Sequence, residues 1–104
     1  MPDQLPEISF GDIWVHLTAG TKLPYLVVSG ETYNALDEDN AIVVPVRPGS
    51  DPRAVVEEHL PEVGVAQLDR LQSLSRSSMI EKIGELGIDR HGAVTRRLRN
   101  LIGV

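Results

Sequence analysis

Alternating hydrophobic and polar positions predict the first β-strand near the N-terminus. Within residues 12–17, the apolar side chains of Ile13, Val15 and Leu17 are each separated by one intervening residue. This period of two places all three side chains on the same face of a strand. We therefore expect a strand over residues 12–17 with one face in the core.

Two further strands are predicted by short runs of β-branched and other apolar residues. Residues 25–29 read Tyr-Leu-Val-Val-Ser and are closed by Gly30. Residues 41–47 form a similar run that contains Pro45. Because proline has no amide hydrogen to donate to a neighbouring strand, we expect this third strand to lie at a sheet edge or to be bulged at Pro45. The polar segment over residues 31–40 connects the two runs.

The second half of the chain contains three shorter strand candidates. Residues 54–60 fit either a strand or one and a half turns of helix, and the strand is preferred. Residues 64–71 and 82–86 are short segments bounded by turn residues and are predicted as strands. Between them, the serine-rich stretch over residues 73–78 is predicted to be a loop with local side-chain to main-chain hydrogen bonds.

The C-terminal residues predict one helix. Over residues 90–102, apolar side chains recur at the intervals of an α-helix with one buried stripe. Asp89 is the expected N-cap, and Gly103 is expected to end the helix. The stripe predicted to pack on the sheet consists of Val94, Leu98, Leu101 and Ile102.

Several strands followed by one helix predict an α+β or small β-barrel fold, with an antiparallel, SH3-like, partly closed sheet and a C-terminal helix. The 104 residues, of which 41% are hydrophobic, are enough for one core. No repeat, linker or low-complexity segment indicates a second domain. We therefore expect a single domain over residues 1–104, in which residues 1–9 form an N-terminal extension.

Composition and charge exclude several classes of protein. No apolar run approaches the roughly 20 residues of a membrane span, and the N-terminus lacks the basic start of a secretory signal. We therefore expect no membrane association and a cytoplasmic location. The formal net charge of -5 argues against a protein that coats nucleic acid through its overall field, so any nucleic-acid site must use a local group of cations.

Residue types alone assign no chemistry. The chain has no cysteine, which excludes thiolate nucleophiles and thiolate metal sites. His16, His59 and His91 have no carboxylate at metal-ligand spacing, so we predict neither a metal site nor a cofactor. The four C-terminal arginines are interpreted as a solvated helix face whose cations suit the negative end of the helix dipole. These arginines are Arg90, Arg96, Arg97 and Arg99.

Seven short segments, however, occur in an order that resembles one protein family. They are residues 11–14 (Gly-Asp-Ile-Trp), 23–29 (Leu-Pro-Tyr-Leu-Val-Val-Ser), Asn34, 42–46 (Ile-Val-Val-Pro-Val), 64–74, 83–86 and the final Leu-Ile-Gly-Val. From Gly11 to the C-terminus, the chain resembles the MazF/PemK toxins of toxin-antitoxin systems. The members of this family are ribosome-independent endoribonucleases on a CcdB/Kid-like barrel.

The resemblance implies a growth-inhibiting toxin of a type II system, a sequence-specific and metal-independent endoribonuclease that cleaves single-stranded RNA. It also implies a homodimer, whose interface is expected on the apolar strand surface near residues 65–71 together with the C-terminus. A cognate antitoxin is expected to cover the RNA groove with an acidic, largely disordered tail. The alternative is a catalytically degenerate binding module that binds an antitoxin or gyrase without cleaving RNA.

The chain departs from the family at three positions of the expected site. The family's arginine before the proline is Leu23 here, with Lys22 one place earlier. The threonine or serine at the end of the third strand is Arg47, and the arginine of the family's QIRTL segment is Gln72. The first loop also lacks the family's glutamate, so no residue inherits the role of general base.

A metal-free ribonuclease needs a base for the 2′-hydroxyl, a proton donor for the 5′-oxygen, and cationic or hydroxyl donors for the charge that develops on phosphorus. We assign catalysis to Arg47, Lys22 and Ser50, with Ser50 in place of the missing hydroxyl. His16 or Asp69 is the candidate acid or base. The residues expected to contact RNA are Lys22, Arg47, Arg53, His16 and Gln72.

The mechanism rests most heavily on Arg47. A guanidinium at the end of the third strand can present its fork to a phosphate, and a charge at a strand-to-turn junction is not expected to be buried. An alternative of equal weight is that Arg47 begins an exposed loop and pairs with Asp51.

Overall fold

The computed structural model describes residues 5–53 and 56–103 of the chain. The strands are β1 (Asp12–Thr18), β2 (Thr21–Val27), β3 (Asn40–Arg47), β4 (Glu57–Leu60), β5 (Gly64–Gln67), β6 (Gln72–Ser75) and β7 (Met79–Glu85). The helices are α1 (Glu31–Leu36) and α2 (Ile88–Ile102), and a 3₁₀ turn spans Arg76–Ser78. Neither α1 nor α2 is long and apolar enough to cross a membrane.

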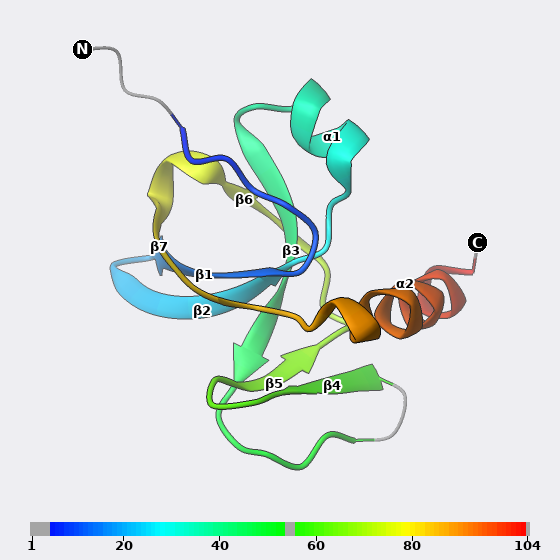
Figure 1. Ribbon diagram of the computed structural model, residues 1–104. Coiled ribbons are helices and arrows are strands. Elements are labelled where there is room, and N and C mark those ends of the chain that lie inside the picture. The colour runs from blue at the N-terminus through cyan, green and yellow to red at the C-terminus, as the bar shows by residue number, and fades with distance from the viewer. Residues whose placement is uncertain (1–4, 54–55, 104) are drawn as a thin grey trace.

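Within the described residues, the strands form one antiparallel sheet in the order β4-β5-β3-β2-β1-β7, and β6 pairs with β3 beside that order. β3 changes partner along one edge: its first half pairs with β6, and its last two residues pair with β5. Figure 1 shows the result, a curled sheet with α2 packed beside it. This is the antiparallel, partly closed sheet with a C-terminal helix that the sequence predicts.

The structure confirms most of the predicted strands and corrects their bounds. β1 and β3 match the predicted segments to within one residue. β2 begins at Thr21 and ends at Val27, because its first residues pair with β1 in a hairpin. β4 covers residues 57–60, while residues 54–55 of that prediction lie outside the described residues. β5 ends at Gln67, where the chain turns.

The polar segment over residues 31–40 contains a helix that the sequence did not predict. α1 has no buried apolar stripe, and its buried residue is Asn34. The Asn34 amide donates to the Ser29 carbonyl at 3.0 Å, and the Ser29 hydroxyl donates to Asn34 Oδ1 at 2.6 Å. Polar contacts with the chain before it therefore hold α1, and such contacts leave no hydrophobic period.

The serine-rich stretch predicted as a loop begins with a strand. In β6, residues 72–75 pair through their main chains with residues 43–40 of β3, although most of their side chains are exposed. The loop prediction is therefore wrong for residues 73–75. It holds for the 3₁₀ turn that follows, where the Ser75 hydroxyl accepts from the Ser77 amide as a local cap.

Pro45 lies in a paired strand rather than at a free edge. On one side, Pro45 faces Tyr25 of β2. On the other side, the pairs with β6 end at Val43 and those with β5 begin at Val46. Pro45 thus occupies the break between two partners, where no neighbouring strand requires its amide hydrogen.

Two clusters of buried side chains form the core. One lies under α2 and between the two ends of the sheet, and includes Ile13, Leu26, Val44, Leu60, Ala66, Leu68 and Val94. The other lies inside the curl of the sheet and includes Ile8, Tyr25, Val27, Val43 and Met79. Ile8 belongs to the expected N-terminal extension, so residues near it are part of the packed domain.

Arg76 ties three segments together from inside the molecule. Its Nη1 donates to the carbonyls of Asn34 and Asp37 at the end of α1, at 3.0 and 3.3 Å. Its Nη2 donates to the Pro6 carbonyl at 2.6 Å. The side chain is only 7% exposed, and its Nε has no hydrogen-bond partner among the described residues. A single buried guanidinium therefore joins the N-terminal segment and α1 to the sheet.

α2 begins and packs differently from the prediction. Gly87 is its N-cap, without a side-chain cap, and Asp89 lies in the first turn. Gly103 ends the helix in a left-handed conformation, as predicted, with φ of 75°. Val94 is fully buried and Leu98 packs on the core.

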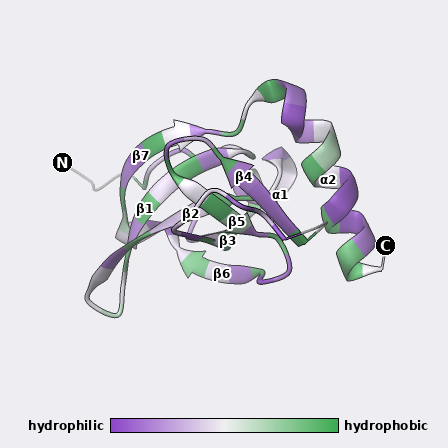
Figure 2. Ribbon diagram, turned by 90° about the horizontal axis from the view of Figure 1, so that it is seen from below, coloured by the Kyte–Doolittle hydropathy of each residue, from purple (hydrophilic) through white to green (hydrophobic). Residues whose placement is uncertain are grey.

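The predicted stripe does not continue to the end of α2. Leu101 and Ile102 are 36% and 55% exposed, because α2 extends beyond the sheet. Figure 2 shows hydrophobic positions on its last turn, close to the C-terminus.

Two of the C-terminal arginines are partly exposed but are paired with an acid. Arg90 donates from Nε and Nη2 to the Glu58 carboxylate of β4 at 2.8 and 3.0 Å. Arg97 donates to the same carboxylate at 2.7 Å. Hydrogen bonds from Arg90 are the largest cause that lowers the pKa of Glu58. These ion pairs fasten α2 to β4.

Candidate nucleic-acid interface

The predicted site residues lie on three connections of the sheet and on the strands beside them. Lys22 lies in β2 next to the β1–β2 turn, and Gln72 begins β6 after the β5–β6 turn. The third connection, from β3 to β4, begins after Arg47 and includes Ser50 and Arg53.

Arg47, the last residue of β3, folds its side chain over the connection to β4. Its Nε and Nη2 donate to the two carboxylate oxygens of Glu57 at 3.0 and 2.7 Å. Nη1 also donates to the Pro48 carbonyl at 3.1 Å, and Nη2 to the Asp51 carbonyl at 2.7 Å. The side chain is 25% exposed, so the charge at this junction is not buried, as expected, but it is paired with an acid. Arg47 does contact Asp51, through the main chain, but its ion-pair partner is Glu57.

The pair between Arg47 and Glu57 stabilises both charges. Hydrogen bonds from the Arg47 side chain, supported by the main-chain N–H of Arg53, lower the pKa of Glu57 from 4.5 to about 2. The hydrogen bond with Glu57 in turn raises the pKa of Arg47. Glu57 is therefore an anion and Arg47 a cation throughout the neutral range.

Ser50 and Arg53 lie on the exposed part of the same connection. Ser50 is exposed between two residues, Pro48 and Asp51, whose carbonyls Arg47 holds. The Arg53 side chain is 75% exposed, and its Nε lies 3.9 Å from Glu57. Arg53 therefore presents most of its guanidinium to solvent, as a phosphate-binding residue requires.

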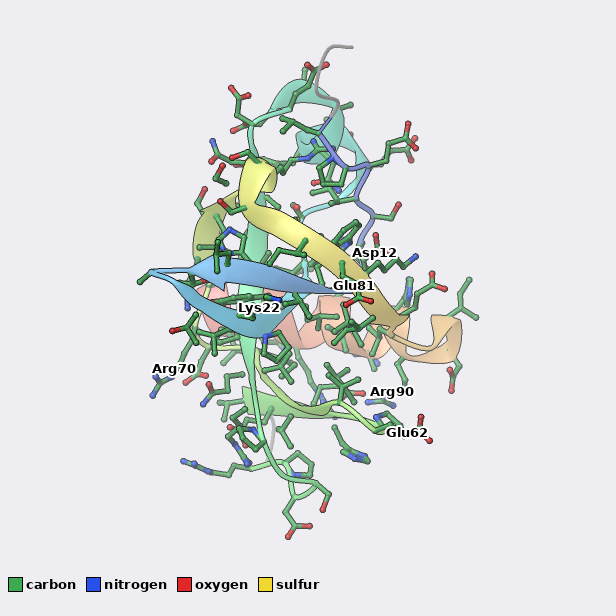
Figure 3. All side chains as sticks on the ribbon, turned by 90° about the vertical axis from the view of Figure 1, so that its left-hand side faces the viewer. Asp12, Lys22, Glu62, Arg70, Glu81 and Arg90 are labelled. Carbon is green, nitrogen blue, oxygen red and sulfur yellow. The ribbon has the colours of Figure 1, made fainter. Side chains whose placement is uncertain are left out.

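Lys22 does not meet Arg47 and Ser50 in one hydrogen-bonded site. The pairing of β2 with β3 ends at Tyr25 and Pro45, and Lys22 lies three residues beyond that point, on the β1–β2 hairpin. No hydrogen bond or ion pair among the described residues joins Lys22 to Arg47 or Ser50. Figure 3 shows Lys22 on this hairpin, facing the viewer.

His16 is buried instead of facing a groove. Its side chain is 5% exposed. Nε2 lies 3.0 Å from the Ser75 carbonyl, and Nδ1 lies 2.7 Å from the Thr18 hydroxyl. Because a carbonyl only accepts, Nε2 carries the proton in the neutral ring and Nδ1 accepts from Thr18. The expectation that His16 contacts RNA is not met in this arrangement, since both ring nitrogens are occupied inside the domain.

The β5–β6 turn contains a cation that the sequence reasoning missed. Gln72, where the family has arginine, is exposed, and Arg70 is exposed two residues before it. The turn is closed by a hydrogen bond from the Arg70 amide to the Gln67 carbonyl at 3.1 Å. Asp69, the other candidate acid or base, is exposed beside Arg70. A basic residue displaced by two positions from a missing arginine is the signal that could have identified Arg70.

Two hollows of the surface lie elsewhere. A groove of about 640 Å³ runs between the β4–β5 turn, the end of β7 and the start of α2, and Pro61, Ile83 and Asp89 are among the residues that line it. A second hollow of about 630 Å³ lies between the N-terminal segment and α1. None of the predicted site residues lines either one. In residues 5–53 and 56–103, no group of three or more His, Asp or Glu side chains is arranged to hold a metal ion.

This arrangement can bind phosphates and supply hydroxyl donors, but it contains no preformed acid–base pair. Lys22, Arg53 and Arg70 are exposed cations on three separate connections (Figure 3 labels Lys22 and Arg70). Exposed cations in such positions suit a flexible polyanion, which can follow several contact points, better than a small ligand.

Comparisons with known proteins identify relatives of this fold. Among solved structures, a MazE-MazF complex from Deinococcus radiodurans has 27% identity and a TM-score of 0.73, and the match covers 98% of this chain and 99% of that one. MazF alone from the same organism has 26% identity and a TM-score of 0.70, with 98% and 100% covered.

An endoribonuclease with its cognate antitoxin from a mycobacterial species shares the fold, with a TM-score of 0.76 at 15% identity and coverage of 93% and 96%. Among curated proteins, no sequence matches the chain significantly. A family description does match: residues 10–102 fit the PemK-like, MazF-like toxin of type II toxin-antitoxin systems. Because this match spans nearly the whole chain, the protein belongs to the PemK/MazF-like toxin family.

Proposed function

We propose that the protein is the toxin of a type II toxin-antitoxin system and that it cleaves single-stranded RNA at specific sequences without a metal ion. The observation that carries the proposal is the family match over residues 10–102, together with similarity to the D. radiodurans MazF over nearly the whole of both chains. The mycobacterial relative of the same fold is described as an endoribonuclease.

RNA binds across the three connections of the sheet. Lys22, Arg53 and Arg70 supply exposed positive charges for phosphates, and Gln72 supplies an amide that can hydrogen-bond to a base. The net charge of -5 makes these local cations the source of affinity, because the overall field repels RNA.

Cleavage uses the groups that these connections expose. These groups lie on three separate connections, so bound RNA must bring them together: Lys22 stabilises negative charge on the phosphorus, Ser50 donates a hydroxyl hydrogen bond, and Asp69 acts as the acid or base. His16 is removed from this list because its ring is enclosed. Arg47 contributes to the same site through its hold on the β3–β4 connection.

The toxin acts as a homodimer in the cytoplasm and is inhibited by a cognate antitoxin. Of the interface expected near residues 65–71, Val65, Ala66 and Leu68 are fully buried within the domain, whereas Leu71 is 41% exposed. The exposed apolar side chains at the end of α2, Leu101 and Ile102, remain available to a second copy. Light scattering that gave the monomer mass at micromolar concentration would contradict the dimer.

A second function, a binding module without catalysis, is favoured by one observation. Both side chains best suited to phosphate activation and proton transfer, Arg47 and His16, are engaged within the domain. A degenerate toxin of this kind would still bind an acidic antitoxin through its exposed cations, and would leave RNA intact.

The experiment that separates these functions uses purified protein with unstructured and structured RNA in EDTA, followed by mapping of new 5′ ends. Cleavage at a recurring sequence in unstructured RNA, in the presence of EDTA, is the expected result. Cleavage that requires added magnesium would contradict the metal-free mechanism. Intact RNA, with retained antitoxin binding, would support the binding module instead.

A further inference from the structure

One carboxylate organises the connection that follows β3. Glu57 Oε1 accepts from Arg47 Nη2 at 2.7 Å and from the main-chain N–H of Arg53 at 2.9 Å, while Oε2 accepts from Arg47 Nε at 3.0 Å. The Glu57 side chain is buried. Glu57 therefore joins the beginning of the connection, at Arg47, to its far side, at Arg53.

Arg47 holds the middle of the same connection. Four of the five N–H groups of its guanidinium are used: two on Glu57, one on the Pro48 carbonyl and one on the Asp51 carbonyl. A phosphate could take the Nε–Nη2 fork of Arg47 only by displacing Glu57. Such an exchange would leave a buried carboxylate without its partner, which is costly.

We propose that Arg47 is a positioning residue, which acts with Glu57 to hold residues 48–53 in the shape that presents Ser50 and Arg53 to RNA. The proposal rests on the proposed function. It assigns a role to Arg47, which stands where the family has threonine or serine. Ser50 lies between the two carbonyls that Arg47 holds, and the exposed Arg53 is the last residue of the segment. An ordered loop binds RNA more tightly because less conformational entropy is lost on binding.

Glu57→Gln is the variant that distinguishes positioning from catalysis. It leaves the Arg47 guanidinium in place and removes the charge that holds it. If Arg47 touches the reacting phosphate, freeing its guanidinium preserves or raises activity. If Arg47 positions the connection, Glu57→Gln lowers activity in the same way as Arg47→Ala. Because misplaced binding groups weaken substrate binding before chemistry, we expect KM to rise about tenfold or more in both variants, with a smaller change in kcat.

The exchanged pair Arg47→Glu with Glu57→Arg separates the ion pair from the rest of the hold. It restores an ion pair across the connection, but it leaves the Pro48 and Asp51 carbonyls without their donor and the Arg53 amide without its acceptor. If Arg47 holds residues 48–53 in place, KM therefore stays raised as in Arg47→Ala, and full recovery of kcat/KM would contradict that hold. Arg99→Ala, which removes an exposed arginine from α2, is the matched control and leaves the kinetic constants unchanged.

Hydrogen exchange over residues 48–53 gives a second measurement that does not depend on activity. If Arg47 and Glu57 hold the connection, amide hydrogens of residues 48–53 exchange faster in Glu57→Gln and in Arg47→Ala, while the melting temperature of the domain stays unchanged. Full activity in Glu57→Gln together with an inactive Arg47→Ala would overturn the proposal. Unmutated protein that neither binds nor cleaves RNA would instead overturn the proposed function.

Discussion

Gly64 packs against the main-chain carbonyl of Arg47, where β5 lies beside the end of β3. Its φ is +152°, and a Cβ built on it would collide with that carbonyl and press on the Val46 side chain. Because the obstacle is backbone, it cannot rotate away. β5 approaches β3 this closely only because residue 64 has no side chain, and the position of Arg47 depends on that approach.

Gly64→Ala should therefore lower the free energy of unfolding by about 2 kcal/mol or more, since both the contact and the backbone conformation resist a side chain. Urea denaturation measures the change. Gly92→Ala is the matched control, because Gly92 lies in α2 with nothing near its missing Cβ. That change should stabilise the domain by up to about 1 kcal/mol. Equal effects of the two substitutions on the free energy of unfolding would show that the contact of Gly64 with the Arg47 carbonyl does not affect stability.

Acid should destabilise the protein through Glu57 and Glu58. The pKa of Glu57 is about 2 in the folded chain against an ordinary value of 4.5, and that of Glu58 is lowered too. A lowered pKa contributes stability that is complete above the ordinary value and is lost as the pH falls from about 4.5 towards 2. Melting temperatures measured between pH 7 and pH 2.5 should fall in this window. The fall should be shallower in Glu57→Gln, and parallel curves would refute the assignment.

Arg76→Met should destabilise the domain although it replaces a buried charge by an apolar side chain of similar length. The carbonyls of Pro6, Asn34 and Asp37 would lose their donor, and an unpaired buried carbonyl costs on the order of 1–3 kcal/mol. Chemical denaturation checks this value. Arg96→Met, at an exposed position of α2, should stay within about 0.5 kcal/mol. A stable Arg76→Met variant would mean that the missing partner of Nε costs as much as the three bonds contribute.

Lys22 and Arg70 should contribute to RNA affinity through charge alone. Changing both to alanine removes two phosphate contacts, which should reduce the slope of log K against log salt by about 1.4 for a single strand. Fluorescence anisotropy with a short unstructured RNA at several salt concentrations measures this slope. Arg99→Ala is the control with an unchanged slope. An unaltered slope in the double variant would place the RNA on another face.

The elements that apolar periodicity predicted are those held by apolar packing. The apolar run of β3 and the buried part of α2 bring residues such as Val44 and Val94 into the core. In β1 the predicted face is wrong beyond Ile13: Leu17 is 45% exposed and His16 is buried, because the pairing of β1 with β7 shifts register twice along the strand. α1 and β6 were missed because polar side chains and main-chain pairs hold them. Periodicity also could not show that α2 extends past the sheet and so leaves Leu101 exposed. An apolar period shows which residues share a face of a helix, but it does not show whether another element covers that face.

The candidate site was predictable in its exposed cations and not in its ion pairs. Lys22 and Arg53 are exposed, as a binding role requires. Nothing in the sequence indicated that Glu57 would pair with Arg47. The two residues are ten positions apart, and ion pairs between distant parts of a chain leave no repeating pattern in the sequence. Arg70 was missed for a related reason, since the family pattern directed attention to position 72.

The two carboxylates of β4 also protect its alignment in the sheet. Neighbouring residues of a strand point to opposite faces, and here Glu57 meets Arg47 while Glu58 meets the arginines of α2. If β4 slipped by one residue, one face would keep a glutamate and the other would receive Val56 or His59, leaving a cluster of arginines without an acid. A misaligned β4 is therefore penalised by charge in either direction, so a strand of four residues can hold a unique register with few apolar contacts.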